Sequence, residues 1–130
     1  MSQHETMRAM SLTAHGGPEA LVYRTDMPVP VPGRSEVLIK VGAAGVNNTD
    51  INTRIGWYSK GEGDVEDASW GGQALSFPRI QGADICGEVV DAGEGADSRL
   101  IGTRVLVEPC LREANGETLP SPWYIGSECD

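Results

Sequence analysis

The chain has 130 residues, a formal net charge of −9 at pH 7 and 39% hydrophobic residues. This length is enough for one domain whose core needs neither disulfides nor metal ions. The negative charge argues against nucleic acid and an acidic membrane surface as partners, because both require clustered Lys and Arg. No stretch has the apolar length of a membrane span, and the first residues lack the features of a signal peptide, so we expect a cytoplasmic protein.

The three cysteines do not predict a disulfide framework, because their number is odd and none forms a Cys-x-x-Cys pair. Cys86 lies within an apolar run and is expected to be a small core residue. Cys110 and Cys129 either meet in space or are free thiols.

The first 41 residues predict three strands. An alternating pattern over residues 7–13 ends at the turn signal His15-Gly-Gly-Pro18, and a second strand follows at 21–25. Alternate prolines over 27–33 predict an extended surface or edge segment. Residues 35–41 form the third predicted strand.

Residues 45–58 combine polar and aromatic side chains directly after the third strand. Two asparagines, a threonine and an aspartate occupy four consecutive positions, residues 47–50. Such residues commonly cap helices, so the simplest interpretation is a strand-to-helix turn with Asn48 or Thr49 as the cap. Residues 49–55 are expected to form one or two helical turns.

The second half of the chain begins with a glycine-rich acidic segment over residues 60–74, which predicts a mobile surface loop or a lid over a site. Strands are expected at 85–91 and 102–109. The turn at 92–97 has Ser98 in place of the third glycine of a dinucleotide-binding fingerprint, and we reject it as one. The tail after residue 109 shows little periodicity.

Six or so short strands joined by Gly/Pro turns predict a mainly β protein, with a partly open β-barrel and one or two short helices. Neither histidine is expected to act as a ligand or base. His4 lies near the end of the chain and His15 in a turn, so both are expected at the surface.

Six motifs in order resemble the N-terminal, GroES-like catalytic domain of medium-chain dehydrogenases/reductases, and the resemblance covers nearly the whole chain. They are Met7-Arg-Ala, His15-Gly-Gly-Pro-Glu, Pro32-Gly-Arg-Ser-Glu-Val-Leu-Ile-Lys-Val, Gly45-Val-Asn-Asn-Thr-Asp, Gly82-Ala-Asp-Ile-Cys-Gly-Glu-Val-Val and Gly102-Thr-Arg-Val. The resemblance implies one GroES-like domain over 1–130. The family normally continues into a Rossmann domain that binds NAD or NADP, so the chain is expected to be a fragment that is inactive by itself.

The resemblance also implies that zinc is absent. Zinc-dependent members have a cysteine at Asn47 and a histidine at Ala83, and a catalytic zinc needs three protein ligands. Asp84, at the position of a nearby glutamate of the family, cannot replace both. Only Cys110 and Cys129 remain where the family has four cysteines for a structural zinc.

The zinc-independent quinone oxidoreductase branch is the more similar one. Five residues match its pattern: Asn47, Asp50, Arg54, Gly56 and Tyr58. This resemblance implies that NADPH reduces quinones, enones or similar activated carbonyl compounds, whose carbonyl is already electron-poor and needs no metal.

By the same resemblance, Asn47 and Tyr58 are expected to face the nicotinamide and the substrate oxygen, with Thr49 as a further hydroxyl donor. Asp50 and Arg54, four positions apart on a helical turn, are expected to form a structural ion pair. The partner is then a small-molecule substrate, and a homo-oligomer is compatible with the family.

Two alternatives stay open. One is a zinc enzyme in which Cys110, Cys129 or Asp84 forms an atypical metal site. The other is a GroES-like binding module without catalysis, because a fold does not imply a function. Trp57 either lines the pocket or belongs to the core.

Overall fold

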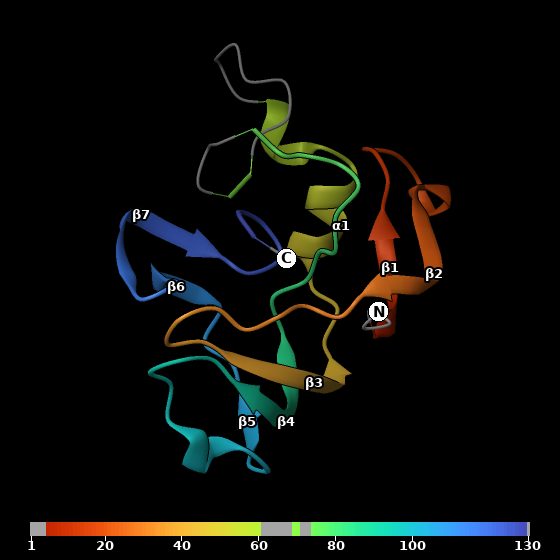
Figure 1. The fold of residues 1–130 in the computed structure, drawn as a ribbon. Coiled ribbons are helices and arrows are strands. Elements are labelled where there is room, and N and C mark those ends of the chain that lie inside the picture. Colours follow the sequence, from red (N-terminus) through yellow and green to blue (C-terminus); the bar gives the residue numbers. More distant parts are fainter. Residues whose placement is uncertain (1–4, 61–68, 71–73, 130) are drawn as a thin grey trace.

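The computed structural model describes residues 5–60, 69–70 and 74–129, and it consists mainly of short strands with a single α-helix in that part (Figure 1). The elements in chain order are β1 (Thr6–Leu12), η1 (Pro18–Ala20), β2 (Leu21–Pro28), β3 (Val37–Ala44), α1 (Asn48–Arg54), η2 (Trp57–Lys60), β4 (Ile85–Ala92), η3 (Ser98–Leu100), β5 (Arg104–Leu106), β6 (Cys110–Ala114) and β7 (Glu117–Tyr124). The predicted mainly β fold class is confirmed.

The strands form three small antiparallel sheets. β1 pairs with β2, β4 lies between β3 and β5, and β6 pairs with β7. In Figure 1, α1 lies between the β1–β2 hairpin on one side and the β6–β7 hairpin on the other. The central β3–β4 pair contains two irregularities of register, one after Leu38 and one after Val41. These bulges twist the pair locally.

Glycine is required at one place in this pair. A side chain at Gly87 of β4 would collide with the backbone of Lys40 on β3, and the two strands could not approach each other as they do. Gly87 therefore permits a close contact between the two strands.

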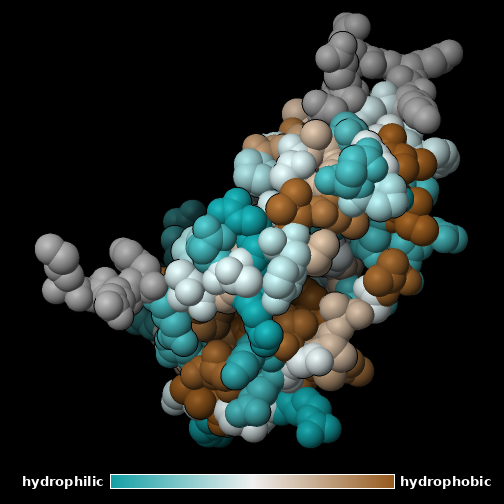
Figure 2. Space-filling view, turned by 90° about the vertical axis from the view of Figure 1, so that its right-hand side faces the viewer, coloured by the Kyte–Doolittle hydropathy of each residue, from teal (hydrophilic) through white to brown (hydrophobic). Residues whose placement is uncertain are grey.

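The core is small. Leu12 and Val89 are the largest apolar side chains with no more than 1% of their surface exposed, while Val31 and Leu106 are more than four-fifths exposed. Figure 2 shows that hydrophobic and hydrophilic residues alternate over the visible face. Several apolar side chains thus lie on the surface of the described residues, where a further part of a protein or a ligand can cover them.

The tail contains a hairpin that the sequence analysis missed. β6 and β7 are joined by Asn115 and Gly116, which both have positive φ angles, 52° and 77°. An Asn-Gly pair in this conformation is a strong hairpin signal, because its twist matches that of the flanking strands. The low periodicity of the tail therefore did not reveal this hairpin.

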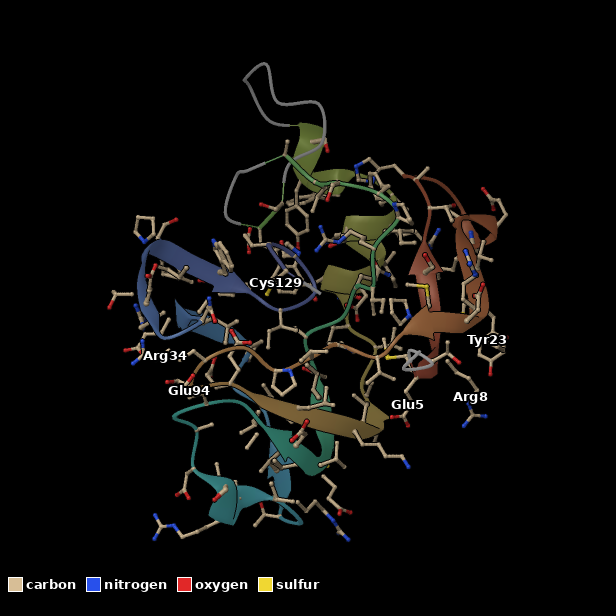
Figure 3. All side chains as sticks on the ribbon, in the orientation of Figure 1. Glu5, Arg8, Tyr23, Arg34, Glu94 and Cys129 are labelled. Atoms are coloured by element: carbon tan, nitrogen blue, oxygen red, sulfur yellow. The ribbon has the colours of Figure 1, made fainter. Side chains whose placement is uncertain are left out.

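The same turn fastens the tail to the segment before β3. The Arg34 N–H donates to Asn115 Oδ1 (2.9 Å), and the Asn115 N–H donates to Glu36 Oε1 (2.8 Å). The Ser35 N–H donates to the carbonyl oxygen of Glu94 (2.8 Å), and Figure 3 shows Arg34 and Glu94 on the same side of the molecule. These hydrogen bonds attach the end of the extended proline segment to the β6–β7 turn and to the turn after β4.

Cys86, Cys110 and Cys129 form no disulfide bond in the part of the chain that the structure describes. Cys86 is half-buried in β4, and Cys129 lies in the turn after β7 (Figure 3). No helix among the described residues has the length and apolar character needed to cross a membrane.

Candidate functional site

The junction between β3 and α1 is built around Asn47, which is the N-cap residue of the helix (φ −121°, ψ 167°). The Asp50 carboxylate accepts a hydrogen bond from the Asn47 N–H (2.7 Å), and the two residues form a capping box. This arrangement satisfies N–H groups that the first helical turn leaves without a partner. The cap was expected at Asn48 or Thr49, and the spacing Asn-x-x-Asp was the signal that identifies Asn47 instead.

The Asn47 side chain also contacts a residue from a distant part of the chain. Its Nδ2 donates to Asp84 Oδ2 at 2.7 Å, and both side chains are exposed. Gly45 makes room for this pair, because a Cβ at Gly45 would lie 2.5 Å from the same Asp84 oxygen. The sequence analysis noted Asp84 at the position of a family glutamate and as a candidate ligand of an atypical metal site, and it did not predict this bond.

Asp84 is positioned in turn by the segment that precedes it. Gly82 has a φ of +110° and packs against Gly126 of the C-terminal turn, which has a φ of +85°. A Cβ at Gly126 would lie 2.5 Å from both the nitrogen and the oxygen of Gly82. The two glycines therefore bring the backbone before Asp84 into direct contact with the turn after β7.

A second set of hydrogen bonds fixes the body of α1. The Thr53 hydroxyl donates to the Thr49 carbonyl oxygen (2.8 Å) and accepts from Trp70 Nε1 (3.0 Å). The Trp70 N–H donates to Ser127 Oγ (2.8 Å), and its ring lies 6.0 Å from that of Tyr124. Nothing in the sequence pattern indicated this role of Trp70.

The predicted mobile loop at 60–74 is only partly within the described residues, since 61–68 and 71–73 lie outside them. Trp70, which belongs to the same predicted loop, contacts α1, the C-terminal turn and β7. For this residue the expectation of a solvated surface loop was wrong.

The ion pair expected between Asp50 and Arg54 is not formed. Asp50 is 8% exposed and its carboxylate is turned toward the helix N-terminus, where it accepts from Asn47. The Arg54 guanidinium donates instead to the Gly16 carbonyl oxygen (2.8 Å), and the Gly16 N–H donates to the Arg54 carbonyl oxygen (2.9 Å). Each side chain is therefore bound to a backbone group, Asp50 to the Asn47 N–H and Arg54 to the Gly16 carbonyl oxygen, and not to the other side chain.

His15 is half-buried, and the expectation of a surface histidine was wrong. Its Nδ1 lies 3.0 Å from the Thr53 carbonyl oxygen, and its ring meets that of Phe77 edge-on at 5.0 Å. Gly56, with a φ of +70°, passes directly under the imidazole. His15 thus fixes the C-terminal end of α1 to the turn after β1, and His4 lies outside the described residues.

The structure places the three predicted site residues along α1 and its continuation. Asn47 is exposed at the N-terminal end, Thr49 is half-buried in the first turn, and Tyr58 is half-buried in η2. A seven-residue helix is about 10 Å long, so Asn47 and Tyr58 lie at opposite ends of α1. Asn47 and Thr49 are two positions apart at the N-terminal end of α1, whereas Tyr58 follows its C-terminal end.

Trp57 lies at the surface of the described residues and not in the core. Its side chain is 55% exposed, and its ring meets that of Tyr58 edge-on at a centroid distance of 5.2 Å. The exposure excludes a place for Trp57 in the core, and its place in the lining of a pocket stays a prediction.

The chemistry that this arrangement offers is hydrogen bonding by neutral polar groups. Asn47 supplies an amide, and Thr49 and Tyr58 supply hydroxyls. Among the residues that the structure describes, no group of three or more His, Cys, Asp or Glu side chains could hold a metal ion. The donor set suits an oxygen atom that gains negative charge during a reaction.

Comparison with known proteins gives a family match over most of the chain. Residues 33–127 match the family model described as the alcohol dehydrogenase GroES-like domain. The chain is similar to the human quinone oxidoreductase, with 35% identity over 105 residues, which are 81% of this chain and 28% of that protein. It is also similar to L-galactonate-5-dehydrogenase of Escherichia coli strain K12, with 31% identity over 79% of this chain and 26% of that protein.

Solved structures share the fold. A candidate alcohol dehydrogenase from Sinorhizobium meliloti 1021 superposes with a TM-score of 0.76 at 41% identity, over 99% of this chain and 36% of that chain. A mycobacterial quinone oxidoreductase superposes with a TM-score of 0.61 at 30% identity, over 85% and 29% of the two chains. The chain thus spans between 26% and 36% of the length of these four relatives.

Proposed function

The chain belongs to the alcohol dehydrogenase GroES-like domain family, and we propose that it forms the substrate-binding part of a zinc-independent, NADPH-dependent reductase of quinones, enones or similar activated carbonyl compounds. The family match confirms the resemblance to the N-terminal domain of medium-chain dehydrogenases/reductases. Because the chain spans 28% of the human relative, the activity is proposed for the polypeptide that carries this chain.

The observation that carries the proposal is the exposed amide of Asn47 at the N-terminal end of α1. An amide in this place offers an N–H to a substrate oxygen, while neither it nor Ala83 supplies a thiolate or imidazole for a catalytic zinc. The similarity to quinone oxidoreductases from several mammals, 33–35% identical, favours a substrate with a conjugated carbonyl.

The described residues fit a nicotinamide in chemical terms. The Asn47 amide is exposed and the Tyr58 phenol is half-buried, and both can form hydrogen bonds with a carboxamide. When bound, NADPH would supply a hydride to the electron-poor carbon of the substrate. The residues of this chain would hold the carbonyl oxygen through the side-chain Nδ2–H of Asn47 and the Thr49 hydroxyl.

In this mechanism the charge develops on the substrate oxygen, and fixed N–H and O–H dipoles stabilise it. Removing one such donor typically lowers kcat by about 100-fold or more. The capping box and the bond to Asp84 hold Asn47 before the substrate arrives, so little reorganisation is needed during the reaction.

The test is quinone-dependent oxidation of NADPH by the polypeptide that carries this chain, after dialysis against EDTA. We expect turnover without added zinc, and Asn47→Ala to lower kcat by about 100-fold. Asn52→Ala is the matched control. Asn52 lies on the same helix, and this substitution removes an asparagine side chain that does not contact Asp84. Unchanged kcat in Asn47→Ala, or turnover that depends on zinc, would contradict the proposal.

The loss must be separated from a loss of folding, because Asn47 is also the helix cap. Replacing an N-cap asparagine by alanine costs about 0.5–2 kcal/mol of stability. Urea unfolding of the same samples measures that cost, and turnover is then compared under conditions where both proteins are folded.

A further inference from the structure

The Asn47 amide has an oxygen end and a nitrogen end, and the structure determines which neighbour each end meets. Nδ2 donates to Asp84 Oδ2 at 2.7 Å. An ionised carboxylate has no hydrogen to donate, so the reversed amide would place two acceptor oxygens against each other. The Asp84 carboxylate therefore permits one orientation of the amide.

The helix favours the same orientation from the other side. Asn47 is the N-cap residue and forms the capping box with Asp50, so its side-chain oxygen belongs on the side of the helix N–H groups. The amide nitrogen then carries one further N–H beyond the one that Asp84 accepts. This N–H is what the exposed side of Asn47 offers to a ligand.

The backbone that precedes Asp84 is restrained by packing, in addition to the bond. Gly45 faces its Oδ2 atom with no room for a side chain. Gly82, two residues earlier, is pressed against Gly126 of the C-terminal turn. The backbone that carries Asp84 is thus held by the fold, and the carboxylate contacts Asn47 without a bound ligand.

We infer that Asp84 is a positioning residue that fixes the polarity of the Asn47 amide, so that Asn47 binds a hydrogen-bond acceptor, namely a carbonyl oxygen. This inference rests on the proposed function and extends it, since it assigns the Asn47 contact to an oxygen and excludes a hydroxyl or amine proton at that position. Two carbonyl oxygens have this chemistry: that of the substrate and that of the nicotinamide carboxamide.

Two variants disturb the carboxylate in different ways. Asp84→Ala removes the acceptor. Gly45→Ala keeps Asp84 but places a Cβ 2.5 Å from its Oδ2, which must move. Glu88→Ala is the control, because it removes an exposed acidic side chain from β4, where Glu88 pairs in register with Lys40. Far-UV circular dichroism establishes that each variant is folded.

The first measurement needs neither cofactor nor activity. The side-chain amide of Asn47 is followed in ¹H–¹⁵N spectra and is assigned from its disappearance in Asn47→Ala. We expect its two proton resonances to move toward each other in Asp84→Ala and Gly45→Ala, because the hydrogen-bonded proton loses its acceptor, and to stay in place in Glu88→Ala. Unchanged Asn47 resonances in Asp84→Ala would overturn the inference.

The second measurement is steady-state kinetics of quinone-dependent NADPH oxidation. A hydrogen-bond donor that is misplaced can lower the reaction rate by up to about 100-fold. We therefore expect kcat to fall at least about 10-fold in both variants. A fall in kcat with unchanged KM for NADPH assigns the contact to the substrate oxygen, and a raised KM for NADPH assigns it to the carboxamide oxygen. A kcat within about twofold of the wild type in Asp84→Ala would overturn the positioning role. If the wild type itself shows no turnover, the proposed function fails, and the spectra alone decide the polarity of Asn47.

Discussion

The contact between Gly82 and Gly126 leads to the most quantitative prediction. Replacing Gly126 by alanine adds a Cβ 2.5 Å from the nitrogen and oxygen of Gly82, at a φ of +85°. The positive φ costs an alanine about 1–2 kcal/mol. Overpacking against a fixed backbone adds about 1–3 kcal/mol. We therefore expect Gly126→Ala to lower the free energy of unfolding by about 2–5 kcal/mol.

Gly102 provides a matched control in the same molecule. Its φ is +86°, and a Cβ at this position would meet no atom within 4 Å. Gly102→Ala therefore carries the conformational cost alone, about 1–2 kcal/mol. The difference between the two variants isolates the contact with Gly82, and we expect it to be about 2 kcal/mol.

The assay is thermal unfolding of the two variants and the wild type, followed by circular dichroism. At about 4 °C per kcal/mol, the Tm of Gly126→Ala should lie about 8 °C below that of Gly102→Ala. If the Tm falls by the same amount in both variants, the C-terminal turn does not pack on Gly82. The explanation of how the backbone before Asp84 is positioned is then wrong.

Two further predictions concern stability. Trp70→Phe removes the indole N–H that donates to Thr53 but keeps an aromatic ring against Tyr124. We expect the free energy of unfolding, measured in urea, to fall by about 1 kcal/mol. An unchanged urea midpoint would show that this hydrogen bond does not contribute to stability. Hydrogen bonds from the Arg99 side chain and then its backbone N–H hold the pKa of Asp97 below its ordinary value of 3.8, so its stabilising contribution is present above that pH and is lost as the pH falls through the folded pKa. Asp97→Asn should therefore lose less stability than the wild type between about pH 5 and about pH 2, and equal losses in urea unfolding would contradict this.

The fold class and the helix were predictable because they depend on local patterns. β-branched runs and Gly/Pro turns predicted β1–β4, and the polar cluster after β3 predicted α1 to within a residue at each end. The hairpin of β6 and β7 carried a signal as well, the Asn115-Gly116 pair, but its strands contain prolines and polar residues that obscure the alternation.

The contacts of the site could not be read from the sequence, because they join segments far apart in the chain. Asp84 lies 37 positions from Asn47, and Ser127 lies 57 positions from Trp70. Local spacing also misled: Asp50 and Arg54 have the separation of a helical ion pair, but backbone groups at the two ends of α1 hold them apart. A rule based on the spacing of residues along a helix does not include hydrogen-bond partners from other parts of the fold.

The most direct test of the central claim is NADPH oxidation by the polypeptide that carries this chain, with p-benzoquinone as acceptor and EDTA present throughout. The account predicts turnover that survives EDTA and falls by about 100-fold in Asn47→Ala but not in Asn52→Ala. Turnover that disappears in EDTA and returns with zinc, or that is the same in Asn47→Ala as in the wild type, would contradict it.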